Sequence, residues 1–178
     1  MYKILIYDKD FNILTTLTNA DYFDLSIINE LGKAGSAEFK VSMIGNKSTA
    51  QNLKLFNRVK IYKGTKFKFI GYIEELSIGV NDINIRCNGM LNFFTKRNVN
   101  RVVIAPSNVS AELTNTLGYI NSLDDTGIDN GIYTTSASIV DNVEMTDITG
   151  LSALEKIAGY DNLNLFIDEN AKLNASKE

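Results

Sequence analysis

The sequence predicts a mainly β protein with an α/β part: a small β-barrel-like domain followed by an α+β domain. In residues 1–97, about seven runs alternate apolar and polar residues, with turn residues every 8–12 positions. After about residue 104, the apolar spacing changes to three and four, with helix-capping residues in front. A chain of 178 residues, 44% hydrophobic, can form one sizeable domain or two small ones. We therefore expect two domains, residues 1–97 and 98–178.

The first domain opens with a predicted β-hairpin. Residues 2–7 and 13–17 alternate on either side of an Asp-Lys-Asp turn. A third strand is expected over 22–31, and two glycines then turn the chain into a strand over 37–43. A hydroxyl cap and apolar spacing predict a short helix over 48–55.

The segment 56–97 is predicted to form the central three-stranded meander of this domain. Its middle strand, 67–80, is apolar on both sides and contains Gly71, where a strand often bends. The second apolar side comprises Ile70, Tyr72, Leu76 and Ile78. Because a lone small barrel has a single inner face, we expect part of this second side to be covered by another subunit or by the α/β unit.

The second domain is predicted to contain two helices joined by an extended segment. Ser107 or Asn108 caps a helix that runs to about residue 120. Thr146 or Thr149 caps a second helix, to about residue 160, with Ile148 on its inner side.

A strand pair is predicted at the end of the chain. Residues 162–168 alternate as a strand, and residues 171–173 begin its partner. The sequence therefore predicts an incomplete hairpin, as in a longer polypeptide that has been truncated, cleaved or shortened.

The side chains on which most enzymes depend are missing. The chain has no histidine, which excludes histidine triads, imidazole acid–base catalysis and most zinc sites. It also lacks nucleotide-binding glycine motifs and paired cysteines. Glu74 and Glu75 are adjacent in a strand and point to opposite sides, while Cys87 lies on an apolar strand face, as a buried structural thiol does. We expect no enzyme, no cofactor, and no catalytic, cofactor-binding or metal-binding residue.

Two charged clusters leave alternatives open. Asp124, Asp125 and Asp129 lie in a glycine-containing loop, either as cation ligands or as a solvated loop. The second cluster comprises Lys60, Lys63, Lys66 and Lys68 with Tyr62, Phe67 and Phe69. It fits a single-strand nucleic-acid platform or a charged edge that discourages strand pairing, and the net charge of −3 favours the edge.

Membrane insertion is not expected. No run of about 18 apolar residues predicts a membrane helix. The N-terminal MYKILIYDKD lacks the basic head and long apolar run of a signal peptide. We expect a protein that folds in a cytoplasm without a membrane anchor.

The order of these segments resembles the baseplate-hub or tail-tip proteins of long-tailed bacteriophages, including the N-terminal region of tail-associated lysins. Three patterns carry the resemblance: V-x-I-Y at Val59–Tyr62, F-x-G-x-I at Phe69–Ile73 and G-x-x-x-x-F-x-x-R at Gly89–Arg97. The helix LSALEKIAGY before a strand–turn–strand is similar as well. The order of the patterns, more than any one of them, carries the similarity.

The resemblance implies a structural component of a phage tail tip or baseplate hub, or of a phage-tail-like particle. Such a protein forms a homotrimeric ring that continues or closes the tail tube, at the virion tail tip assembled in the host cytoplasm. The implied partners are a distal tail or tail-tube protein, the tape-measure protein and a tail fibre, without nucleic-acid sequence recognition.

This chain departs from the family at its end, where the second barrel domain and the cell-wall hydrolase of some members are missing. That departure puts a complete ring and a lysin activity in doubt. The alternative hypothesis is a carbohydrate- or protein-binding β-barrel module, which predicts a monomer with an exposed aromatic surface.

Overall fold

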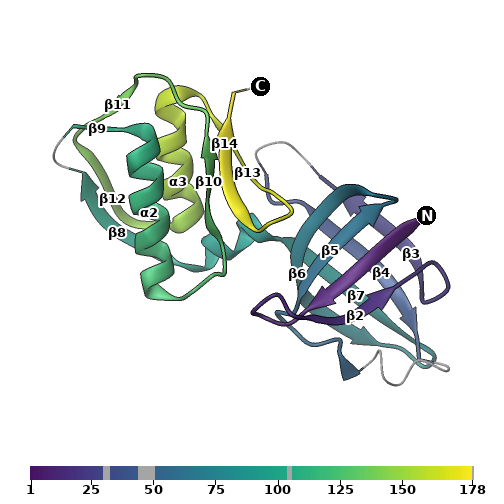
Figure 1. Ribbon diagram of the computed structural model, residues 1–178. Coiled ribbons are helices and arrows are strands. Elements are labelled where there is room, and N and C mark those ends of the chain that lie inside the picture. The colour runs from purple at the N-terminus through teal and green to yellow at the C-terminus, as the bar shows by residue number, and fades with distance from the viewer. Residues whose placement is uncertain (30–32, 44–50, 104–105, 178) are drawn as a thin grey trace. The chain divides into compact units, whose positions relative to one another are not determined.

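The computed structural model describes residues 1–29, 33–43, 51–103 and 106–177 (Figure 1). Its internal contacts define two compact units that meet between Met90 and Leu91. The first is a β-sheet, and the second combines helices with small sheets. The sequence places the limit at 97–98, and that division into domains remains a prediction.

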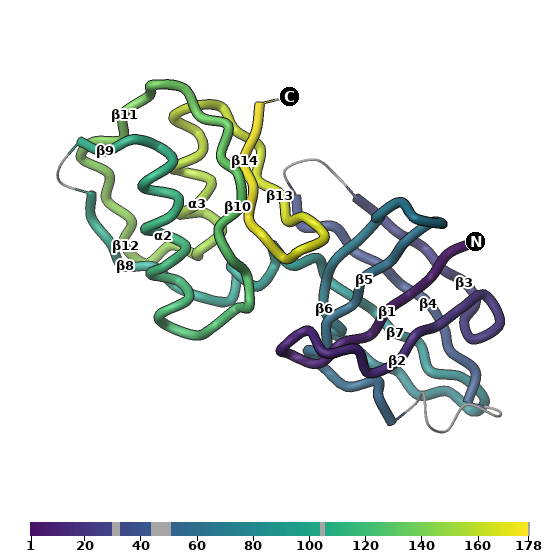
Figure 2. The backbone as a smooth tube through the Cα atoms, in the orientation of Figure 1, coloured from purple at the N-terminus to yellow at the C-terminus, as the bar shows by residue number. Residues whose placement is uncertain are grey.

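The first unit is a seven-stranded antiparallel sheet in the order β2-β1-β5-β6-β7-β4-β3. Its strands are β1 (Tyr2–Tyr7), β2 (Ile13–Leu17), β3 (Tyr22–Ile28), β4 (Ser36–Ser42), β5 (Arg58–Lys63), β6 (Lys66–Ile78) and β7 (Asp82–Gly89). The β5–β6–β7 meander is the one that the sequence predicts. In the described part of the chain β2 and β3 do not pair, so the sheet curves around its core and leaves two edges (Figure 2).

A single apolar core fills the inner side of this sheet. It contains buried side chains from six strands and one connecting segment: Ile4, Ile6, Leu17, Ala37, Phe39, Val41, Leu53, Val59, Ile61, Phe69, Ile73, Ile83, Ile85 and Cys87. Burying one large aliphatic side chain contributes about 1.5–3 kcal/mol relative to leaving it exposed. Burial also raises the pKa of the Cys87 thiol, as expected for a structural cysteine.

The segment before β5 completes the core beside β2. Leu53 is buried, and the side-chain amide of Asn52 donates to the carbonyl of Leu14 at 3.3 Å. Most of the helix predicted over 48–55 lies outside the described residues. Residues 53–57 themselves are turn, with the Asn57 amide donating to the Lys54 carbonyl at 3.2 Å.

Two β-bulges explain why β6 is apolar on both sides of its sequence pattern. The pairing with β5 skips Lys68, and the pairing with β7 skips Glu74. Each extra residue moves the side chains beyond it to the opposite face. Phe67 consequently lies beside Tyr62 on the outer face, whereas Leu76 packs against the core.

The second apolar side of β6 is therefore smaller than the sequence predicts. The expectation that another subunit or unit covers it is wrong for Leu76, which belongs to the core side. Phe56 of the same unit stacks on Tyr72, with ring centroids 6.2 Å apart. Ile70 is buried as well, and Ile78 is 74% exposed.

Three glycines let neighbouring strands approach closely at one end of the sheet. Gly71 pairs directly with Gly89, and the Gly89 amide donates to the Gly35 carbonyl at 2.7 Å. A Cβ on Gly71 would lie 2.2 Å from the Asn88 carbonyl oxygen, and a Cβ on Gly89 would lie 2.9 Å from the Gly35 nitrogen. The backbone itself therefore excludes larger residues at this bend.

The second unit has helices α2 (Val109–Leu123) and α3 (Gly150–Ala158), with 3-10 turns η1 (Met90–Lys96) and η2 (Gly159–Asp161). Its strands are β8 (Asn98–Val103), β9 (Ser107–Asn108), β10 (Asp129–Tyr133), β11 (Ile139–Val140), β12 (Val143–Thr149), β13 (Asn164–Ile167) and β14 (Lys172–Ser176). They form the sheets β10-β14-β13, β11-β9 and β12-β8. The two helices pack side by side, between β8–β12 and the three-stranded sheet (Figure 1).

Each helix begins at one of the two caps that the sequence offers. The Asn108 side chain accepts from the Ala111 amide at 2.7 Å, and Thr149 accepts from the Ser152 amide at 3.2 Å. Because α3 begins after Thr149, Ile148 belongs to strand β12 and not to the helix as predicted.

The final hairpin is complete, which corrects the prediction of a shortened one. β14 pairs with β13 in four register pairs, from Asn164–Ser176 to Ile167–Leu173, and runs parallel to β10 on its other side. Polar Asn174 hides this strand in the sequence. Its side chain accepts from the Ile132 amide at 2.8 Å and donates to the Lys172 carbonyl at 2.8 Å.

The glycine bend gives a first prediction. Gly71→Val should destabilise the protein by about 1–3 kcal/mol, because the new side chain meets the backbone of Asn88. Denaturant unfolding measures the loss. Gly118→Ala is the control: this exposed α2 glycine has open space around its Cβ position, and alanine should add about 0.5–1 kcal/mol. An unchanged midpoint for Gly71→Val would contradict the close strand approach.

Asp161 gives a second prediction, which concerns pH. Its carboxylate accepts from the Ser136 amide at 2.6 Å and from the hydroxyl groups of Ser136 and Ser138. These hydrogen bonds hold the pKa of Asp161 below its ordinary value. The stability that they provide is therefore present above the unfolded pKa, about 3.9, and is lost as the pH falls through the lower folded pKa.

Asp161→Asn should accordingly lower the unfolding midpoint at pH 7, and its difference from the wild type should shrink at about pH 3. Urea titrations at both pH values measure this. An equal difference at the two pH values would show that the carboxylate charge does not stabilise the loop.

Candidate functional site

The two edge strands of the first unit are the clearest candidate surfaces for a partner. β2 has no charged residue and β3 has only Asp24, although natural sheet edges usually carry charges that prevent pairing. Apolar side chains are exposed on both: Ile13 (62%) on β2, and Phe23 (41%) and Ile28 (57%) on β3. Each edge therefore offers backbone hydrogen-bonding groups beside apolar side chains.

Part of each edge is protected. In β3, Asp24 has a φ of +55° within a register irregularity, and Lys40 pairs with its carboxylate at 3.0 Å. This distortion leaves Ser26–Ile28 as the regular part of β3. On β2, the bond from Asn52 occupies the carbonyl of Leu14.

A polar groove of about 320 Å³ lies next to the β3 edge. The register aligns Ser26, Glu38, Arg86 and Glu75 in one row across β3, β4, β7 and β6. Asn84 donates to Glu38 at 2.9 Å, and Arg86 lies 3.9 Å from Glu75, with both of those side chains about 60% exposed. Exposed pairs of this kind contribute roughly 0–1 kcal/mol. The groove offers hydrogen-bonding groups to a partner and no activated nucleophile.

Sequence reasoning missed this row because its members are far apart in the chain. Only the strand register brings them together, and a single sequence carries no direct signal of register. The two adjacent glutamates are also separated as expected, because Glu74 accepts from the side-chain amide of Asn88 while Glu75 faces Arg86.

The aspartates after α2 serve local structure. Asp124 pairs with Arg97, and Asp125 accepts from the Gly127 amide at 2.9 Å. Across the described residues, no group of three or more His, Cys, Asp or Glu side chains is arranged to hold a metal ion.

The lysine–aromatic cluster is divided by the structure. Phe69 lies in the core, 2% exposed. The Lys60 ammonium group lies over the rings of Tyr7 and Phe11, 5.0 and 4.9 Å from their centroids. The Lys63 ammonium group lies 5.6 Å from the centroid of Tyr2.

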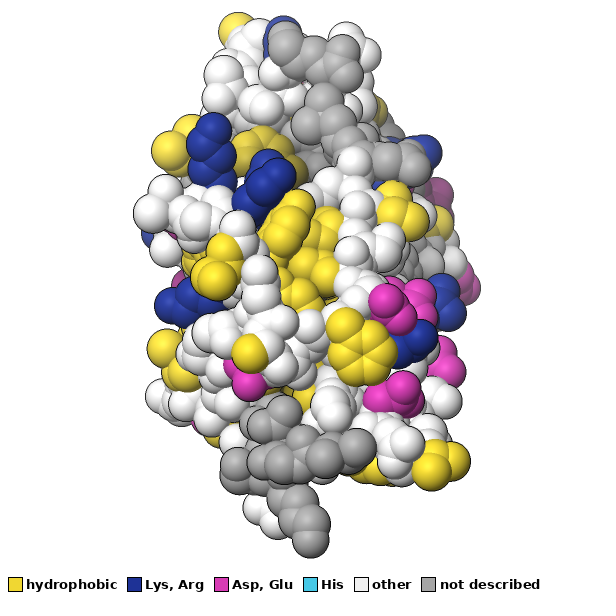
Figure 3. Space-filling model, turned by 90° about the vertical axis from the view of Figure 1, so that its right-hand side faces the viewer, with side chains coloured by type: hydrophobic (Ala, Val, Ile, Leu, Met, Phe, Trp, Pro, Cys, Tyr) yellow, Lys and Arg dark blue, Asp and Glu magenta, His cyan; other side chains and the backbone are white. Residues whose placement is uncertain are grey.

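Hydrophobic side chains gather in the middle of the face shown in Figure 3, with Lys and Arg on one side and Asp and Glu on the other. This mixed surface is typical of a region that contacts protein. None of the helices in the described ranges has the length and apolar character needed to cross a membrane.

No protein-family model and no curated protein matches the sequence. Solved structures do match. A tail protein from Neisseria meningitidis MC58 has a TM-score of 0.68 at 11% identity, over 98% of this chain and 50% of that one. Prophage tail protein gp18 from Listeria monocytogenes EGD-e has 0.65 at 15%, over 97% and 50%. The 43 kDa tail protein of prophage MuSo2 from Shewanella oneidensis has 0.63 at 14%, over 99% and 55%.

A fourth structure, the E. coli c3393 protein, is a component of the type VI secretion system, described as similar to the T4 tail proteins gp27 and gp5. It has a TM-score of 0.51 at 9% identity, over 87% of this chain and 48% of that one. The chain spans about half the length of these solved proteins. Its fold is that of phage tail proteins.

Proposed function

We propose that this protein is a structural component of a phage tail tip or baseplate hub, or of a phage-tail-like particle. The similarity to three tail proteins over 97–99% of the chain supports this role. The observation that carries the assembly argument is the pair of unclosed edges, β2 and β3, with their exposed apolar side chains. Its role is structural and not enzymatic.

The two edges explain how copies would join. β2 and β3 differ, so pairing β2 of one copy with β3 of the next is a heterologous contact, and such contacts close into a ring when the rotation allows. We propose a homotrimeric ring that continues or closes the tail tube at the virion tail tip. Its further partners are a distal tail or tail-tube protein, the tape-measure protein and a tail fibre.

The polar groove beside β3 favours a second candidate, a carbohydrate- or protein-binding module. Its serine, asparagine, glutamate and arginine side chains can exchange hydrogen bonds with sugar hydroxyl groups. This candidate requires neither edge pairing nor a second copy, so the oligomeric state separates the two.

A double variant, Ile13→Lys with Ile28→Lys, tests the proposal. Charges on both edges should prevent strand pairing, while changes at exposed positions usually alter stability by less than about 0.5 kcal/mol. We expect wild-type protein with the purified tail-tube protein to form trimers by light scattering, and the double variant to stay monomeric. Val80→Lys is the control, because Val80 is 92% exposed at a hairpin tip outside both edges.

A wild-type protein that remains monomeric with tail proteins present would contradict the ring and favour the binding module. Equal loss of assembly in the control variant would instead show that the edges are not the contact. Unfolding midpoints of all variants establish that each one is folded.

A further inference from the structure

Positive charge is concentrated in one part of this acidic chain. Residues 1–90 contain 12 Lys and Arg against 9 Asp and Glu, a net charge of +3. Residues 91–178 contain 6 against 12, a net charge of −6. Within the first part, the stretch 59–73 has four lysines and no carboxylate. The overall charge of −3 therefore hides a local basic region.

The structure removes one explanation for these lysines. Edge protection requires charges on edge strands, but β5 and β6 are the third and fourth of seven strands. Both have hydrogen-bonded neighbours, whereas the edge strand β2 has no lysine. The lysines at this central hairpin need another reason.

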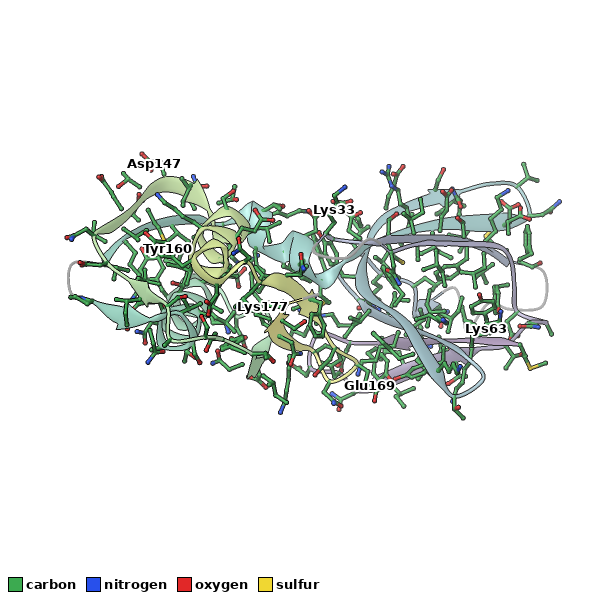
Figure 4. The ribbon with its side chains drawn as sticks, turned by 90° about the horizontal axis from the view of Figure 1, so that it is seen from above. Lys33, Lys63, Asp147, Tyr160, Glu169 and Lys177 are labelled. Carbon is green, nitrogen blue, oxygen red and sulfur yellow. The ribbon has the colours of Figure 1, made fainter. Side chains whose placement is uncertain are left out.

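The hairpin lysines, defined as Lys3, Lys63, Lys66 and Lys68, lie close together. Lys63 and Lys66 form a register pair across the turn, where Gly64 has a φ of +62°. Lys68 is the bulge residue, and Lys3 pairs in register with Tyr62 on the neighbouring strand β1. Figure 4 shows Lys63 at this end of the first unit.

This arrangement places like charges opposite one another at a small cost in stability. All four side chains are exposed, and in the described part of the chain no ion pair joins them to a carboxylate. A bound anion would remove the repulsion.

The aromatic residues here do not offer a platform for stacking bases. Tyr62 and Phe67 pack edge to face on each other, 5.9 Å between centroids, and Phe69 is in the core. What remains is a group of ammonium ions, which bind phosphate groups as point charges. Contacts of this kind carry no sequence information.

We propose that the hairpin lysines bind the phosphate backbone of nucleic acid without sequence preference. The proposal does not depend on the assembly role, because the lysines lie outside both edge strands. Double-stranded DNA supplies the dense array of charge that four neighbouring lysines can engage.

Fluorescence anisotropy with a labelled random duplex of about 20 base pairs tests this. Four phosphate contacts predict that log K falls with log[salt] with a slope of about −3.6. The triple variant Lys63→Gln, Lys66→Gln, Lys68→Gln should bind on the order of tenfold or more weakly at low salt, with a slope near about −1. Its unfolding midpoint should not fall, because the change removes like-charge repulsion.

The matched control removes three exposed lysines elsewhere, Lys9→Gln, Lys172→Gln and Lys177→Gln, with the same change in net charge. It should bind like the wild type. No binding by the wild type at low salt, or equal loss in the control, would overturn the proposal.

Two competition outcomes would also overturn it. Much tighter binding of single-stranded DNA would indicate base stacking, and equal binding of polyglutamate would indicate an acidic protein partner. A triple variant that loses DNA but still forms trimers separates this proposal from the assembly role.

Discussion

The close approach of β4, β7 and β6 at Gly35, Gly89 and Gly71 is the constraint on which the first unit depends. Backbone atoms take the space that side chains would need there, so the strands can bend together at one end. The bulges at Lys68 and Glu74 add local twist and reverse the faces of β6. Together they let one sheet surround a core that ends in the buried side chains of Phe39, Ile73 and Cys87.

The curvature has a cost at the ends of the strand order. β2 and β3 follow one another in the chain, yet no pairing joins them among the described residues. The fold therefore combines a complete core with two edges that present unpaired backbone and exposed Ile13 and Ile28. Completeness inside and incompleteness at the edges is what a subunit of a larger assembly needs, and it is the physical basis of the proposed tail role.

The sequence predicts the strands of the first unit and the helix starts of the second because those signals are local. Alternation identifies β1 to β7, and Asn108 and Thr149 act as caps with any tertiary packing. Register is not local, so the bulge that sends Leu76 to the core was missed. The same holds for the row from Ser26 to Glu75 and for β14, whose buried Asn174 reads as a polar tail until its partners are known.

Hydrogen exchange of the two edge strands, in free protein and in assembled tail particles, tests the central claim most directly. Unpaired edge amides exchange quickly, and pairing with a neighbouring copy protects them. The account predicts that assembly slows exchange at Ile13–Leu17 and at Ser26–Ile28, with little change at the central strand β5. Protection confined to other parts of the chain, with both edges exchanging as fast as in the free protein, would contradict it.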